Sequence, residues 1–60
     1  MLHKIELSEG KIFYYDPEYR ILFKENNRDH PVQTKWFSDE DLREFHRKTQ
    51  IIHDQIKKDN

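Results

Sequence analysis

The sequence predicts a small α+β domain of the order βββα, in which a three-stranded antiparallel β-meander is followed by one long C-terminal amphipathic helix packed on one sheet face. The N-terminal half holds three short stretches of alternating or clustered apolar residues, which is typical of β-strands. A polar stretch follows, and apolar residues then recur at spacings of three and four, which is typical of a helix with one buried face. At 60 residues, the chain is expected to form a single domain, residues 1–60.

The three predicted strands occupy residues 2–7, 11–15 and 19–24. In the first strand, Ile5 and Leu7 alternate with charged neighbours. The second and third are rich in β-branched and aromatic residues, which favour strands. Between them lie two turns: the first contains the only glycine, and in the second Pro17 presets one backbone angle. Strands joined by such short turns form an antiparallel meander.

The register of the first hairpin depends on its turn. A two-residue turn at Glu9-Gly10 would pair Leu7 with Ile12, whereas a bulged turn with Gly10 in the left-handed conformation would pair Leu7 with Lys11. A slip of one residue turns every side chain of a strand over, so the two turns predict opposite faces. We prefer the two-residue turn because it gathers most apolar residues on one face: Ile5, Leu7, Ile12, Tyr14, Ile21 and Phe23.

In the second hairpin, a four-residue loop over residues 16–19 would pair Tyr15 with Arg20 and Tyr14 with Ile21. The other sheet face would then carry aromatic and apolar residues among charged ones: Phe13, Tyr15 and Leu22 with Lys4, Glu6, Arg20 and Lys24. One helix covers one side of a sheet, so this second face is expected to be open.

Residues 25–34 are polar, contain the second proline and are predicted to form the one long loop. Trp36 follows this loop directly. It is predicted either to pack over the sheet edge or to form a very short fourth strand.

The helix is predicted over residues 39–58. Ser38 is a suitable N-cap, and Asp41 is placed to reach back to it in a short capping box. The apolar stripe is Leu42, Phe45, Thr49, Ile52 and Ile56. Such a helix is about 30 Å long, whereas each strand spans about 17–20 Å. The overhanging end near Ile52 and Ile56 therefore favours a homodimer.

The charge, the cysteine content and the length of the apolar runs limit the classes of function that the chain can have. Charged residues make up 38% of the chain, but the net charge is only −1, which argues against strong nonspecific attraction to nucleic acid. The absence of cysteine excludes disulfides and thiolate metal sites. No apolar run is long enough for a signal peptide or a membrane span, so a cytoplasmic protein is expected. The lack of alanine beside many Ile, Lys, Asn and Asp residues is typical of an AT-rich genome, such as that of a phage or other mobile element.

No motif predicts catalysis, a metal site or a cofactor. His46 and His53 share one helix flank but lie about 10.5 Å apart along the axis, too far for one metal ion. Ser8 and Ser38 are explained by a turn and a cap, and a single glycine excludes a Gly-rich phosphate loop. We therefore expect no enzyme, and no metal or other cofactor.

The leading hypothesis is a small non-enzymatic protein-interaction module, a regulator or inhibitor that acts by binding another protein. Its candidate surfaces are the second sheet face and the distal helix, represented by Phe13, Tyr15, Arg20, Leu22, Ile51, Ile52 and Ile56. The alternative is a weak single-stranded nucleic-acid-binding protein, with Phe13 and Tyr15 stacking on bases and Lys4, Arg20 and Lys24 contacting phosphates. For the sheet face alone, the alternative without function is that the aromatic rings merely pack against Lys and Arg stems in solvent. A third hypothesis for the chain is a merely structural piece of a larger assembly, which predicts a poorly folded isolated chain.

Overall fold

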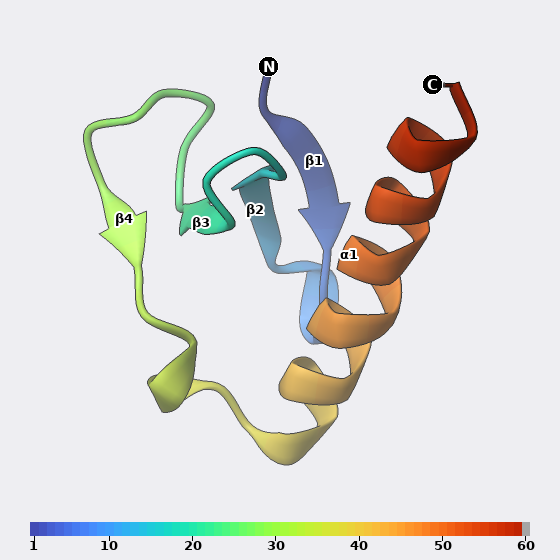
Figure 1. The fold of residues 1–60 in the computed structure, drawn as a ribbon. Coiled ribbons are helices and arrows are strands. Elements are labelled where there is room, and N and C mark those ends of the chain that lie inside the picture. Colours follow the sequence, from blue (N-terminus) through green and yellow to red (C-terminus); the bar gives the residue numbers. More distant parts are fainter. Residues whose placement is uncertain (60) are drawn as a thin grey trace.

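The computed structural model describes residues 1–59 and confirms the α+β prediction: an antiparallel sheet is followed by one C-terminal helix (Figure 1). The sheet has four strands in sequential order, one more than predicted. Its elements are β1 (His3–Glu6), β2 (Ile12–Asp16), β3 (Ile21–Phe23), β4 (Pro31–Val32) and the helix α1 (Asp39–Asp59). Two short 3₁₀ turns, η1 (Ser8–Gly10) and η2 (Thr34–Trp36), join them.

The additional strand β4 lies inside the stretch predicted as loop. Val32 pairs with Leu22 and Pro31 pairs with Phe23, which places β4 at one edge of the sheet. Two residues are too few to produce a periodic pattern, and a proline argues against a central strand. An edge strand tolerates Pro31 because it is paired on one side only.

The preferred register of the first hairpin was wrong, and the bulged alternative is the one observed. Ile5 pairs with Phe13, and the Leu7 N–H donates to the Lys11 carbonyl at 2.7 Å. Both Glu9 (φ 60°) and Gly10 (φ 72°) adopt left-handed conformations, which lengthens the turn by one residue. Relative to β1, the strand β2 is therefore turned over compared with the prediction.

The second hairpin also differs from the prediction, in this case by two residues. Tyr15 pairs with Leu22 and not with Arg20, because Arg20 belongs to the turn. The turn is held by the Asp16 carboxylate, which accepts the backbone N–H groups of Glu18 (2.9 Å) and Tyr19 (3.3 Å). A slip of two residues preserves the faces, so β2 and β3 are turned over together.

The core accordingly forms on the face that was expected to be open. Its centre is Ile5, Tyr15 and Leu22, which are 3–4% exposed. Partly buried residues surround this centre: Phe13, Val32, Phe37, Phe45 and Ile52. Ile12 and Ile21, which were predicted to lie under the helix, are instead 39% and 40% exposed. Tyr14 also belongs to the face away from the helix, because it neighbours Tyr15 on β2.

Phe23 is buried although it lies on the outer sheet face. Its neighbour Leu22 faces the core, so Phe23 points the other way, and it is 3% exposed. The loop between β3 and β4 supplies Arg28, whose guanidinium lies 5.8 Å from the centre of the Phe23 ring. Arg28 also forms an ion pair with the buried Asp16. The loop therefore closes part of the second sheet face.

The helix matches its prediction to within one residue at the C-terminal end. The Ser38 hydroxyl accepts the N–H of Asp41 at 3.2 Å, as expected for an N-cap. The Asp41 carboxylate does not reach back to Ser38. It accepts hydrogen bonds from the Ser8 hydroxyl at 2.5 Å and from Lys11 Nζ at 2.7 Å. Asp41 thus ties the start of α1 to the first turn of the sheet.

Candidate protein-interaction groove

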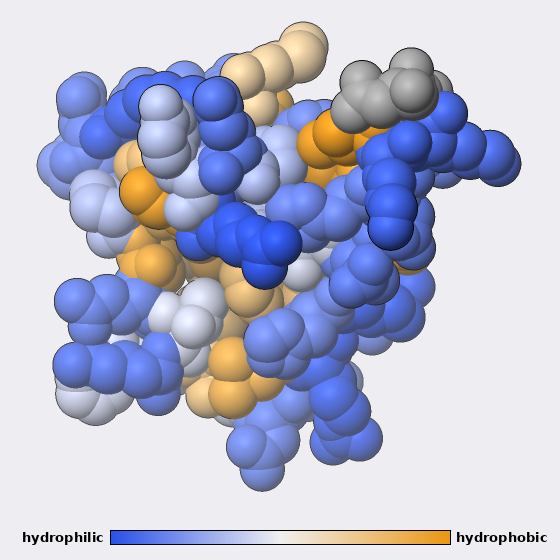
Figure 2. All heavy atoms as spheres, viewed as in Figure 1, coloured by the Kyte–Doolittle hydropathy of each residue, from blue (hydrophilic) through white to orange (hydrophobic). Residues whose placement is uncertain are grey.

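The helix does not cover the sheet evenly. In Figure 1, α1 runs beside β1 and β2, whereas β3 and β4 lie farther from it. Three cavities follow the resulting gap and share Arg20 as a lining residue. We call them together the α1–β3 groove. In the space-filling view, hydrophobic residues surface in this hollow between hydrophilic rims (Figure 2).

The end of the groove next to β4 is largely apolar. This cavity of about 420 Å³ has four apolar and four polar lining residues: Ile21, Leu22, Val32 and Phe45, and Arg20, Gln33, Thr34 and Lys35. Trp36 does not line the cavity, but it is 80% exposed and its ring centre lies 5.2 Å from the Lys35 ammonium. Because a large apolar side chain fits such a cavity, this end is suited to hold an anchoring residue of a partner.

In the middle of the groove, Tyr15 of the sheet contacts His53 of the helix, and both residues line the cavity there. Tyr15 Oη and His53 Nε2 lie 2.9 Å apart, and the two rings meet edge to face with centres 5.7 Å apart. Burial raises the pKa of Tyr15, and the charge of Arg20 acts against this rise. This contact joins the sheet to the helix where both line the groove.

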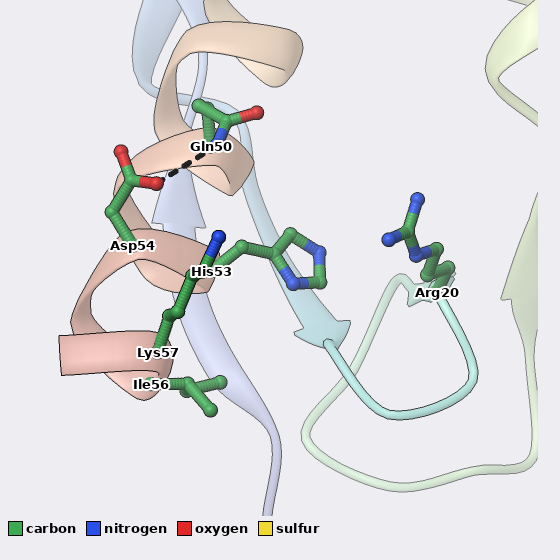
Figure 3. A pocket seen from close by; sticks show the side chains of 6 residues that line it. All are labelled: Arg20, Gln50, His53, Asp54, Ile56 and Lys57. Atoms are coloured by element: carbon green, nitrogen blue, oxygen red, sulfur yellow. Dashed lines mark hydrogen bonds between the residues drawn. The ribbon is translucent and has the colours of Figure 1, made fainter. Parts of the chain in front are cut away.

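The far end is polar. Its cavity of about 440 Å³ lies between Arg20 and the helix residues Gln50, His53 and Lys57 (Figure 3). Arg20 extends from the β2–β3 turn toward α1, and His53 points back toward it. The one carboxylate here, that of Asp54, accepts a hydrogen bond from the Gln50 amide at 3.0 Å.

Arg20 has an unusual backbone. Its φ is 58°, in the left-handed region, which costs a residue with a side chain roughly 1–2 kcal/mol. Glycine or asparagine is the common choice at such a position. Strained residues of this kind cluster at functional sites, so Arg20 is the leading candidate for a binding residue.

The groove carries unpaired positive charge. Among the side chains of residues 1–58, the ion pairs join Lys11 to Asp41, Arg28 to Asp16, and Glu44 to Arg47 and Lys48. None of these pairs includes Arg20, Lys35 or Lys57, which all line the groove. The groove is therefore an apolar trough with cations along its length.

The residues singled out from the sequence are scattered by the fold. Tyr15 and Leu22 lie in the core, so their expected exposure was wrong. Phe13 is half-buried against Phe37, with ring centres 5.3 Å apart. Only Arg20 and Ile56 line the groove as exposed residues, Ile52 packs on the core, and Ile51 is 49% exposed outside the groove.

The face proposed for nucleic acid does not exist in the expected form. Tyr15 is buried, and Phe13 points into the core side, so the two rings do not form an open stacking platform. Lys4 and Lys24 are exposed but do not line the groove with Arg20.

The sequence analysis did not identify Val32, Lys35 and His53 as groove residues, nor Trp36 as an exposed residue next to Lys35. A signal was present for Trp36, since a lone tryptophan in a polar stretch is a common binding residue. Its predicted packing on the sheet edge was wrong, because it ends η2 with its ring exposed. The others carry no local signal.

The described residues were searched for a metal-binding cluster and for a membrane-spanning helix. In the part of the chain that the structure describes, no three His, Asp or Glu side chains converge so that they could hold a metal ion. Over the same residues, α1 is too polar to cross a bilayer. Comparisons with protein-family models, curated proteins and solved structures found no match.

Proposed function

We propose that this chain is a small non-enzymatic protein-interaction module, a regulator or inhibitor that binds another protein in the α1–β3 groove. The observation that carries this proposal is the open cavity between β3, β4 and α1, where half-buried Val32 and Phe45 lie over the core residue Leu22. Arg20 and Lys35 line the same cavity and take part in none of the ion pairs among the described side chains. Charged residues make up 38% of the chain, and the exposed apolar side chains Ile12, Tyr19 and Ile51 line none of the three cavities. An apolar hollow with a polar rim is typical of a site that another molecule covers.

The residue types also support a protein partner. Trp and Arg dominate the binding energy of many interfaces, and both occur here, as the exposed Trp36 and as Arg20. The elements around the groove are tied together by the Tyr15–His53 hydrogen bond and by the Asp16-anchored turn, so little backbone ordering would be needed on binding. Such a preformed site lowers the entropic cost of association.

The groove replaces the sheet face as the proposed surface. The sheet-face version required exposed Tyr15 and Leu22, and the nucleic-acid alternative required the same open aromatic residues. Both lack that basis in the fold. A homodimer remains a prediction from the exposed Ile51 and Ile56, and it belongs to the same class of function.

A bulky substitution inside the groove tests this proposal. Gln50 lines two of the cavities from an exposed helix position, so Gln50→Trp should obstruct the groove without disturbing the core. Gln55→Trp is the matched control, because Gln55 is exposed on the same helix but lines none of the three cavities.

The readout is affinity capture from the natural host followed by direct binding of the recovered protein. We expect a partner that binds the wild type and the Gln55→Trp variant alike, and the Gln50→Trp variant at least about tenfold more weakly. Equal binding by both variants would remove the groove from the proposal. If light scattering over a dilution series shows a dimer broken by Gln50→Trp alone, the groove holds a second copy of the chain.

A further inference from the structure

We infer that the α1–β3 groove recognises an acidic peptide segment, with one carboxylate on Arg20 and one large apolar side chain in the cavity at Leu22, Val32 and Phe45. This inference rests on the proposed function and specifies the chemistry of the partner. It follows from four features of the groove: its charge, the anchored turn of Arg20, the closed sheet edge and the length of the trough.

The charge of the groove calls for an anion. Arg20 lines all three cavities, Lys35 stands at the β4 end and Lys57 at the far end. Against them stands one carboxylate, Asp54, which already accepts the Gln50 amide at 3.0 Å. An acidic segment is the complementary partner, because charge complementarity steers association and fixes register.

Arg20 is held in place for a planar anion. Its turn is anchored by Asp16, which is 1% exposed and accepts the N–H groups of Glu18 and Tyr19. Arg28 holds that carboxylate from its other side. The turn therefore fixes where the Arg20 side chain starts, and the planar fork of a guanidinium matches the two oxygens of a carboxylate.

The left-handed backbone of Arg20 supports the same inference. The turn would form more easily with glycine at this position, yet a long cationic side chain occupies it. Such strain is often found at functional sites, and of the two left-handed residues that are not glycine, Glu9 and Arg20, only Arg20 lines the groove. The gain here is a guanidinium placed opposite α1 (Figure 3).

The partner is not an added strand. The sheet has two edges, β1 and β4, and β4 is the one that borders the groove. Its Pro31 lacks an N–H with which a further strand could pair. Nucleic acid also fits poorly, because the net charge is −1 and Asp39, Glu40 and Asp41 open the helix. A peptide side chain can instead enter the cavity from above the trough.

The length of the trough sets the size of the segment. It follows α1 from Phe45 to Lys57, which is about 18 Å at 1.5 Å per residue. An extended peptide rises about 3.3 Å per residue, so five or six residues span this distance. The apolar residue belongs at the β4 end and the carboxylates toward Lys57.

The test uses a capped hexapeptide with one leucine among glutamates, Glu-Leu-Glu-Glu-Gly-Glu, and its counterpart with glutamine in place of each glutamate. Binding is followed by ¹H–¹⁵N chemical-shift changes and by the emission of Trp36, the only tryptophan. We expect shifts confined to groove residues and about tenfold weaker binding of the glutamine peptide. Added salt should weaken only the glutamate peptide.

Variants assign the carboxylate to Arg20. Arg20→Gln should lose about tenfold in affinity for the glutamate peptide and almost nothing for the glutamine peptide. The matched control is Arg43→Gln, since Arg43 is exposed on α1 but lines none of the three cavities. Equal losses in both variants, or no loss in either, would overturn the inference, as would tighter binding of a twelve-residue oligothymidine.

The inference and the proposed function fail differently. If Gln50→Trp abolishes binding of the natural partner and Arg20→Gln leaves it unchanged, the groove binds a protein but not through a carboxylate. If neither substitution affects the natural partner, the groove itself is the wrong surface.

Discussion

Replacing Arg20 with glycine should make the protein more stable while it removes the proposed anion contact. Arg20 has a φ of 58°, and relief of this left-handed strain is worth roughly 1–2 kcal/mol. Glycine also gives the unfolded chain more freedom, which costs about 0.4–1 kcal/mol. The net expectation is a gain of about 0.5–1 kcal/mol in the free energy of unfolding.

Two measurements check this expectation. Urea denaturation followed by circular dichroism gives the free energy of unfolding, and a thermal scan should show a rise in Tm of about 3–6 °C for a domain of this size. Arg20→Ala is the matched control, because it removes the same guanidinium but keeps a Cβ and hence the strain.

The comparison between the two variants decides the outcome. If Arg20→Gly is less stable than Arg20→Ala, the backbone of Arg20 is not strained, and one argument for its functional role is lost. If Arg20→Gly is the more stable and also loses the acidic peptide, Arg20 is a position where stability is given up for binding.

Three further predictions test the fold. Leu22→Ala should lower the free energy of unfolding by about 2–5 kcal/mol and Ile21→Ala by less than about 1 kcal/mol, because Leu22 is 3% exposed and Ile21 is 40% exposed. The reverse order in urea unfolding would favour the register that the sequence analysis preferred. The hydrogen bonds from Lys11 and Ser8 lower the pKa of Asp41 from 3.8 to about 2, so its contribution to stability is complete above pH 4 and is lost as the pH falls toward 2. The Asp41→Asn variant should therefore lose less of its free energy of unfolding between pH 4 and pH 2 than the wild type does. An equal loss in both proteins over this range would contradict the role given to Asp41. Tyr15→Phe should cost about 1 kcal/mol through loss of the hydrogen bond to His53, and a neutral result in urea unfolding would mean that this bond contributes nothing net.

The positions of the first three strands agreed with the prediction, whereas their register depended on the conformation of the turns. The positions of the first three strands were largely predictable, because β-branched and aromatic residues cluster there. The register was not, because Glu9 adopts a left-handed conformation that glutamate does not signal. The bulged turn formed by Glu9 and Gly10 turned β2 and β3 over relative to the prediction, placed Tyr15 and Leu22 in the core and removed the predicted sheet-face site.

The candidate site was predictable at few of its residues. Arg20 was named from the sequence, but as part of an open sheet face and not as the residue that lines a groove. Val32 and Lys35 lie in a stretch that reads as polar loop and its continuation, so nothing local marks them. Their role depends on where β4 and η2 come to lie relative to α1.

The sequence by itself determined the α+β class, the helix and its cap at Ser38, because these depend on interactions between residues at most four positions apart. Only the tertiary structure decided which sheet face meets the helix, what Asp41 binds and where the groove opens. Each of these depends on contacts between residues far apart in the chain, and strand pairing with period two makes the result reverse on a slip of one residue.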